Sequence, residues 1–179
     1  MNFRLWTTPI FLYPSWLDEN SLSLSINDNI FKAGRVYFCN HLTQNLVWIP
    51  EYKSHKNNVS EIAEITVIDS NPLSILKKIN KITDNIKIDK QENVITVKTD
   101  DIKISLYDKR SFKERYKNFG EEINLRKEMF GSLTLKTSSF LFLRKINQIN
   151  FHNLLKFEDE NKIQFLLKDY NLILEFIKI

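Results

Sequence analysis

The sequence predicts an α+β fold with one or two mainly antiparallel sheets of six or more strands, and with two or three helices packed on one side. Two hairpin patterns and one amphipathic helix support this prediction. The chain has 179 residues, of which 42% are hydrophobic and 27% are charged. A chain of this length can bury a core without disulfides or metal ions. We expect one domain, residues 1–179, with a sub-boundary near the polar segment 51–60.

The clearest hairpin pattern lies in residues 94–107, VITVKTDDIKISLY. A turn at Asp100-Asp101 would pair apolar or β-branched residues across it: Thr99 with Ile102, Val97 with Ile104, and Ile95 with Leu106. A slip of one residue would turn all these side chains outward, so the pattern fixes the register. We expect this hairpin at the centre of a sheet, with a further strand at Ile86 and Ile88 leading into it.

A second hairpin is predicted near the C-terminus, with its turn at Asp169-Tyr170. Its predicted pairs are Leu167 with Leu172, Phe165 with Leu174, and Ile163 with Phe176. Leu166 and Ile173 make the other face apolar as well, which indicates burial on both sides. A helix is the alternative for this segment. The two hairpins share a pattern but no sequence period, so the sequence does not predict an internal repeat.

Three helices are predicted. The first begins at Pro72, with Asn71 as its cap, and its apolar face consists of Leu73, Leu76, Ile79 and Ile82. The second begins at Ser111, ends at Gly120, and places Phe112, Tyr116 and Phe119 on one face. The third is predicted over 121–130 and ends at Gly131. The remaining predicted strands are 22–26, 36–38, 46–49, 61–68 and 133–143.

Composition restricts the class of protein. The single cysteine, Cys39, excludes an intrachain disulfide and favours a reducing, cytoplasmic location. Only three glycines are present, which argues against Gly-rich phosphate-binding loops. No apolar run approaches the roughly 20 residues of a membrane span. We expect no metal or cofactor, because the histidines (His41, His55 and His152) are far apart in the sequence.

The leading functional hypothesis is a non-catalytic protein-binding domain, such as a dedicated inhibitor, an immunity protein or a subunit of a larger assembly. It rests on the absence of a recognisable catalytic motif. It also rests on the aromatic, charge-poor N-terminal segment, where Trp6, Phe11, Tyr13 and Trp16 would contact a partner protein. Packing in the core is the alternative role for these rings. The sequence leaves the question of enzymatic activity open and favours its absence.

Two alternatives depend on charged residues. Lys109, Arg110, Lys113 and Lys117 on the predicted second helix would follow the phosphates of a nucleic acid. A solvated helix face is the simpler role for them. Asp101-Ile-Lys103 and Glu51-Tyr-Lys53 each resemble half of a PD-(D/E)xK nuclease motif, with Asp69 or Asp84 as the further metal-binding acid. A chain this rich in Asp, Glu and Lys also produces such triplets by chance.

Overall fold

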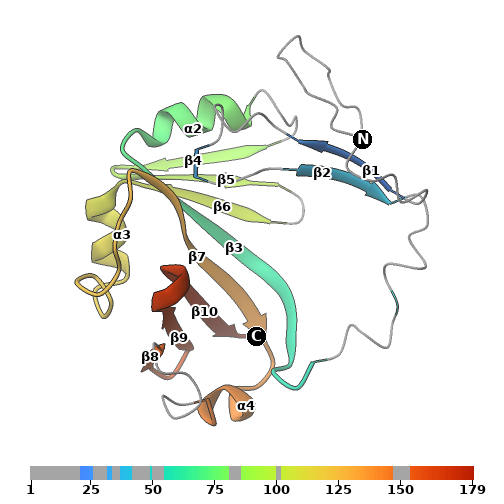
Figure 1. The fold of residues 1–179 in the computed structure, drawn as a ribbon, viewed down its shortest axis with the longest axis vertical. Helices are drawn as coiled ribbons and strands as arrows, with labels where there is room; N and C mark the ends of the chain where they lie inside the picture. The colour runs from blue at the N-terminus through green and yellow to red at the C-terminus, as the bar shows by residue number, and fades with distance from the viewer. Residues whose placement is uncertain are drawn as a thin grey trace.

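The computed structural model describes residues 21–25, 32–33, 37–41, 49, 55–80, 86–99, 102–146 and 154–179. Its main body is an eight-stranded sheet in the order β4-β5-β6-β3-β7-β10-β9-β8 (Figure 1). A separate antiparallel pair consists of β1 (Ser21–Ser25) and β2 (Tyr37–His41). The elements of the main body are β3 (Val59–Asp69), α2 (Pro72–Ile79), β4 (Lys87–Gln91), β5 (Val94–Lys98), β6 (Lys103–Tyr107), α3 (Lys109–Arg115), β7 (Glu128–Thr137), α4 (Leu141–Arg144), β8 (Leu154–Glu158), β9 (Lys162–Leu167), a 3-10 turn (Lys168–Tyr170) and β10 (Leu172–Lys178).

The large sheet consists of two units with the same order of elements. The first unit is β3-α2-β4-β5-β6, and the second unit is β7-α4-β8-β9-β10. In each unit the first strand pairs in parallel with the last strand, and the other pairs are antiparallel. The units join through the antiparallel pair β3–β7. The sequence did not predict this repeat, because it lies in the topology and not in a sequence period.

The two faces of the sheet carry different helices. In Figure 1, β4–β6 form an upper arm and β8–β10 a lower arm, with β3 and β7 between them. Helix α2 covers the upper arm and α4 the lower arm from outside, so we call this side the outer face. Helix α3 lies at the end of the space between the arms, on the inner face. Consecutive residues confirm the division, because Leu106 packs in the α2 cluster and Tyr107 in the α3 cluster.

The predicted α+β class and the mainly antiparallel sheet are therefore confirmed. The sheet also contains two parallel pairs, β3–β6 and β7–β10. The finer expectation of helices packed on one side is wrong, because α2 and α4 pack on the outer face and α3 on the inner face. Among the described helices, none is long and apolar enough to cross a membrane.

Both predicted hairpin registers are confirmed. Val97 pairs with Ile104 and Ile95 with Leu106 in the first hairpin. At the turn end of the hairpin, Thr99 N–H donates a hydrogen bond of 3.0 Å to the Ile102 carbonyl. Asp100 and Asp101 themselves lie outside the described residues. The hairpin is not at the centre of the sheet as expected, because β3 and β7 occupy that position.

The C-terminal segment is a hairpin and not a helix. Its pairs are Leu167 with Leu172, Phe165 with Leu174, and Ile163 with Phe176. Leu166 and Ile173 on its other face are both fully buried. The prediction of a strand pair buried on both sides is therefore confirmed.

The first predicted helix forms with some changes. It begins at Pro72 as predicted, but Asn71 makes no side-chain cap. Leu73, predicted to face the core, is 49% exposed, and Ile75 is buried with Leu76 and Ile79. Ile82 lies outside the described residues.

The second predicted helix begins earlier than expected. Asp108 caps α3 by accepting a 2.7 Å hydrogen bond from Ser111 N–H, so the helix starts at Lys109. Phe112, Tyr116 and Phe119 are buried as predicted.

The third predicted helix is wrong. Residues 121–127 form turns and irregular backbone, and β7 begins at Glu128. Tertiary packing overrides the local pattern, because β7 lies between β3 and β10 and pairs with both. Gly131 is part of this strand and not a helix stop. The predicted strand over 133–143 ends at Thr137, and α4 occupies its last residues.

The other predicted strands have mixed outcomes. Strands β1, β2 and β3 lie at the strands predicted over 22–26, 36–38 and 61–68. The predicted strand over 46–49 falls almost entirely outside the described residues.

Candidate functional site

A row of mostly polar side chains crosses the inner face at one level of the sheet. Its middle members are buried, and the outer face at the same level carries apolar residues such as Ile65, Ile104 and Leu133. We call it the inner row. In strand order its members, each paired with the next, are Lys87, Lys98, Lys103, Glu64, Thr134, Glu175, Gln164 and Phe157.

Arg115 of α3 lies over the inner face and contacts the middle of the inner row. Its Nη1 lies 2.8 Å from Glu64 Oε1 and its Nη2 lies 3.1 Å from Glu64 Oε2, which is a two-pronged ion pair. Nη2 also lies 3.4 Å from Glu175 Oε1. The side chains of Glu64 and Glu175 are each only 7% exposed, and that of Arg115 is 25% exposed. Arg115 therefore connects α3 to both units at once.

The two buried carboxylates have a donor on each oxygen. Lys103 Nζ lies 3.0 Å from Glu64 Oε2. Glu175 accepts hydrogen bonds from Thr134 Oγ1 at 3.1 Å and from Gln164 Nε2 at 2.5 Å. Buried charges are tolerated when they are paired and hydrogen-bonded in this way. Glu64 and Glu175 are therefore fixed in place and cannot easily exchange their partners.

Two tyrosines hold the Arg115 guanidinium from its sides. The ring centroids of Tyr107 and Tyr116 lie 5.5 Å and 5.1 Å from Arg115 Cζ, within the range of cation–π attraction. Arg115 Nη1 also donates to Tyr107 Oη at 2.7 Å. Tyr116 Oη lies 2.7 Å from Ser132 Oγ on β7. The orientation of Arg115 is thus set by carboxylates below and aromatic rings beside it.

The electrostatics keep these groups in one charge state around neutral pH. Burial raises the pKa of Glu64, but hydrogen bonds and charge from Arg115, with smaller contributions from Ser105 and Lys103, bring that pKa below its ordinary value. Burial alone would lower the pKa of Arg115. Its ion pair with Glu64 and the adjacent Tyr116 and Tyr107 outweigh burial and raise that pKa above its ordinary value. Burial also raises the pKa of Tyr116 to about 12. These three groups supply fixed charge and hydrogen bonds and do not exchange protons near pH 7.

The donor set of this cluster does not suit a divalent cation. The guanidinium of Arg115 already bridges the two carboxylates, and Lys103 neutralises one of them further. Divalent cations prefer several anionic or carbonyl oxygens without a competing positive charge. Within the part of the chain that the structure describes, no group of three or more His, Cys, Asp or Glu side chains could hold a metal ion.

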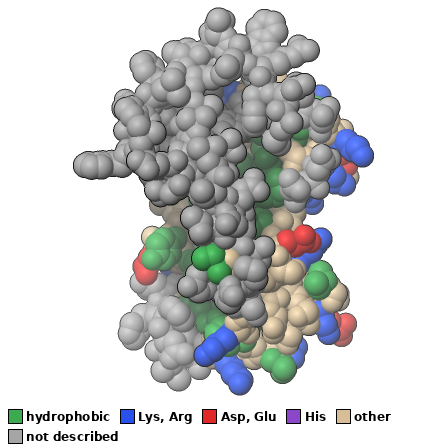
Figure 2. Space-filling model, turned by 90° about the vertical axis from the view of Figure 1, so that its right-hand side faces the viewer, with side chains coloured by type: hydrophobic (Ala, Val, Ile, Leu, Met, Phe, Trp, Pro, Cys, Tyr) green, Lys and Arg blue, Asp and Glu red, His purple; other side chains and the backbone are tan. Residues whose placement is uncertain are grey.

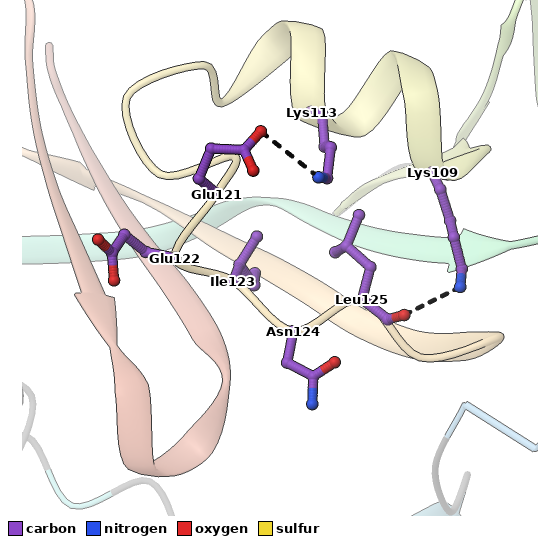
Figure 3. A pocket seen from close by; sticks show the side chains of 7 residues that line it. All are labelled: Lys109, Lys113, Glu121, Glu122, Ile123, Asn124 and Leu125. Carbon is purple, nitrogen blue, oxygen red and sulfur yellow. Dashed lines mark hydrogen bonds and ion pairs between the residues drawn. The ribbon is translucent and has the colours of Figure 1, made fainter.

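A hollow of about 470 Å³ lies between α3 and the segment 121–125 (Figure 3). Its lysines are already occupied, because Lys109 Nζ donates to the Leu125 carbonyl at 2.9 Å and Lys113 Nζ lies 3.7 Å from Glu121. Glu122 accepts from Lys168 Nζ at 2.7 Å. Each charged side chain that lines this hollow therefore already has a hydrogen-bond or ion-pair partner.

A smaller cavity of about 160 Å³ lies on the outer face of the second unit. Only apolar side chains line it: Ile146, Leu154, Phe165, Leu167, Leu174 and Phe176. A site without polar groups cannot orient a ligand, and specific small-molecule sites usually contain a few of them. The inner row is therefore the strongest candidate among the described residues.

The surface charge of the described residues is mixed and does not locate a site by itself. Figure 2 shows Lys and Arg side chains mainly along the right and lower margins of the side that it draws, with Asp and Glu side chains among them. The location of a site must therefore come from specific neighbours and not from the net charge of +4.

The predicted basic ridge does not form as a single surface. Lys109 and Lys113 line the hollow beside α3, while Arg110 pairs with Glu114 at 3.1 Å. Lys117 lies beyond the end of α3 at Arg115. The four residues are thus divided between different environments, and two of the basic heads pair with glutamates.

Several other predicted site residues lie outside the described part of the chain. These are Trp6, Phe11, Tyr13, Trp16, Glu51, Lys53, Asp84 and Asp101. The partner-binding role of the four aromatic residues stays a prediction. The structure describes Lys103, the lysine of one predicted nuclease motif, and shows it in an ion pair with Glu64.

Sequence patterns did not identify Glu64, Arg115 or Glu175. Glu64 and Glu175 each lie inside an apolar strand, in AEITVID and LILEFI. A charged residue at one position in such a run is the signal that could have identified them, because a buried charge needs a partner.

Comparison with solved structures places the arrangement among known folds. A hypothetical protein from Staphylococcus aureus matches with a TM-score of 0.55 and 11% identity over 89% of this chain and 50% of that chain. This chain thus spans half the length of that protein. Methylmalonyl-CoA epimerase from Mycobacterium tuberculosis matches with a TM-score of 0.40 and 8% identity, over 70% of this chain and 91% of that one. A glyoxalase/bleomycin resistance protein/dioxygenase from Nocardioides matches with a TM-score of 0.30 and 11% identity, over 76% and 92%.

These neighbours overturn the predicted function. The hypothesis of a non-catalytic inhibitor, immunity protein or assembly subunit rested on a missing catalytic motif. The missing motif does not favour a protein-binding role, because active sites can assemble from residues that are far apart in the sequence. Proteins named as an epimerase and a dioxygenase are among the structures that match. The nucleic-acid-binding and nuclease alternatives find no support in these three structures. No residue role transfers at these identities.

Sequence comparison does not name a family. No protein-family model matches the chain, and comparison with curated protein sequences finds no match. The likeness to the staphylococcal protein therefore shows the fold alone.

Proposed function

We propose that this chain binds a small molecule on the inner face of its large sheet, beside Lys103 and Arg115. The observation that carries the proposal is the way these two cationic heads are held. Both are partly exposed, with side-chain exposures of 37% for Lys103 and 25% for Arg115, while the carboxylates that orient them are buried.

This arrangement matches the requirements for a binding group of fixed geometry. A side chain that contacts a ligand is effective when neighbours lock its position before the ligand arrives. Glu64 bonds both Arg115 and Lys103, so one buried carboxylate fixes the positions of two partly exposed cationic groups. The rings of Tyr107 and Tyr116 restrict Arg115 further.

The contrast between the faces supports the inner location. On the outer face, β5 and β6 bury Ile95, Val97 and Leu106 against α2, as expected for a purely structural layer. On the inner face the middle of the sheet buries polar side chains, namely Glu64, Thr66, Ser105, Ser132, Thr134, Gln164 and Glu175. Burial of polar groups costs free energy, so an apolar layer would pack this face more stably than a polar layer does. The polar layer therefore indicates a role other than packing.

Thermal unfolding against a panel of polar metabolites tests this proposal. A ligand present at about 100 times its dissociation constant stabilises the native state by about 2.7 kcal/mol. For a chain of this size this corresponds to a rise in Tm of about 5–10 °C. We expect at least one compound to raise the Tm of the wild type and to have a much smaller effect on Lys103→Gln.

The matched control is Lys113→Gln, which removes the same charge beside the hollow of Figure 3. A compound that binds the inner face should stabilise this variant as it does the wild type. Compounds that depend on Lys113 and not on Lys103, or a panel without any stabilising compound, would contradict the proposal.

A further inference from the structure

We propose that Lys87, Lys98 and Lys103 together recognise a compact anion with two or more negative charges, such as a diphosphate or tricarboxylate group. The inference rests on the proposed function, because it assigns a chemical class to the ligand of the same face.

The three lysines stand next to one another on three adjacent strands. Lys87 pairs with Lys98, and Lys98 pairs with Lys103. Because paired residues point to the same face, all three side chains lie on the inner face. With strands about 4.8 Å apart, the backbones of the outer two are about 10 Å apart. A compact group with several charges can span this distance between flexible lysine heads.

Like charges placed directly opposite each other destabilise a sheet. Lys98 has a lysine on both sides, so it experiences this repulsion twice. Within the described residues, Lys87 and Lys98 form no ion pair, and Lys103 pairs with Glu64 alone. The other carboxylate on this part of the inner face, Asp89, is exposed and accepts a hydrogen bond from Gln91 at 3.3 Å. A bound anion would relieve the repulsion.

Protection of a sheet edge does not explain the whole pattern. Lysines on edge strands prevent pairing with other chains, and this role fits Lys87 on the edge strand β4. Lys98 and Lys103 lie on β5 and β6, which have neighbours on both sides. The fold does not require lysines at this level either, since the second unit places Glu175, Gln164 and Phe157 in the same row.

Arg115 extends the site at its inner end. Lys103 and Arg115 both bond Glu64 and are therefore close neighbours. Glu175 offsets the charge of Arg115, and Glu64 offsets that of Lys103. Among the described residues, Lys87 and Lys98 form no ion pair, and the exposed Asp89 bonds Gln91 instead. Three adjacent lysine heads therefore suit a divalent or trivalent anion better than a monovalent one.

Isothermal titration with pyrophosphate and, separately, with citrate tests the inference. We expect binding to the wild type that weakens when the salt concentration rises from about 50 to about 500 mM. Lys98→Gln should weaken binding by about two- to fivefold, the range for losing one exposed charge contact. Both probes should bind if charge alone decides, whereas binding of one probe alone would identify phosphate or carboxylate as the ligand group.

The matched control is Lys90→Gln. Lys90 is an exposed lysine on the same strand as Lys87, but it pairs with Ile95 and so lies on the outer face. Its removal should leave the affinity unchanged. Equal losses in Lys90→Gln and Lys98→Gln, or no binding of either probe, would overturn the anion site. The proposed function would survive that result if the thermal panel still gave a neutral ligand dependent on Lys103.

Discussion

The two units of the sheet have the same topology but differ in the helix that covers the outer face and in the residues on the inner face. The first unit covers its outer face with α2, eight residues long, whereas the second unit has only the four-residue α4 and the apolar cavity of about 160 Å³. Within the inner row the first unit contributes lysines and one glutamate, and the second unit contributes Thr134, Glu175, Gln164 and Phe157. A repeated backbone therefore does not imply a repeated site.

The difference has a physical origin in α3. Only one such helix lies between the units in sequence, and its Arg115 must satisfy carboxylates from both of them. Once Arg115 bonds Glu64 and Glu175, the carboxylate that the second unit contributes to the inner row has a positive partner. The lysines of the first unit keep a net positive charge toward solvent. The asymmetry of the inner face follows from this unequal distribution of partners.

The largest expected effect comes from breaking the link between the units. Arg115→Met leaves two carboxylates buried without their shared cation, so it should lower the free energy of unfolding by about 3–5 kcal/mol. Urea denaturation followed by tryptophan fluorescence and circular dichroism measures this change. Arg110→Met is the control, because its side chain is 87% exposed and should contribute no more than about 0.5 kcal/mol. Equal effects of the two substitutions would show that the link is unimportant.

A smaller effect is expected where α3 packs on the second unit. A Cβ on Gly131 would lie 2.6 Å from Phe112 Cε2 and 2.8 Å from Ile68 Cδ1. Gly131→Ala must therefore displace a buried ring and should cost about 1–3 kcal/mol in thermal or urea unfolding. At Gly120 the nearest atoms to a new Cβ are 3.7–3.8 Å away, so Gly120→Ala should leave the stability nearly unchanged. A neutral Gly131→Ala would contradict the packing of α3 on β7.

Replacement of Glu64 should produce an effect that depends on pH. The folded-state pKa of Glu64 lies below its ordinary value of 4.5, so ionised Glu64 stabilises the fold above that pH. This contribution is lost as the pH falls through the lowered pKa. Glu64→Gln should cost about 1–2 kcal/mol at pH 7, and the difference from wild type should shrink below about pH 4.5. Glu61→Gln, at an exposed glutamate paired with Lys136, should show neither effect. A deficit independent of pH would argue against the ion pair.

The smallest expected effect has the opposite sign. Lys98→Gln removes two like-charge contacts, so in low salt and without an anion it should stabilise the protein by a few tenths of a kcal/mol. Salt should abolish this gain, because screening weakens the same repulsion in the wild type. Parallel urea titrations at low and high salt measure it. Destabilisation by this substitution in low salt would show that Lys98 has an attractive partner.

Local patterns were sufficient for the parts of the fold that depend on neighbours in sequence. Alternation fixed both hairpin registers, because each pairs residues across a short turn. The local pattern failed for β7, because the polar residues 121–127 before it resemble part of a helix. Only the pairing of β7 with β3 and β10 makes the segment from Glu128 a strand. The repeat of two units was also missed, since it appears only in how distant strands pair.

The candidate site could not be predicted for the same reason. Arg115 is 51 residues from Glu64 and 60 residues from Glu175 in the sequence. No spacing rule connects them, and each carboxylate interrupts an apolar run that reads as an ordinary strand. The lysine row likewise becomes visible only when the register of β4, β5 and β6 is known.

The most direct test of the contrast between the units is an amide chemical-shift map recorded while pyrophosphate is added to the folded protein. We expect saturable shifts in β4, β5 and β6, strongest around Lys98 and Lys103, and little change at the same level of β8 and β9. Shifts centred on Gln164 and Phe157, or around α3 at Lys109 and Lys113, would contradict it.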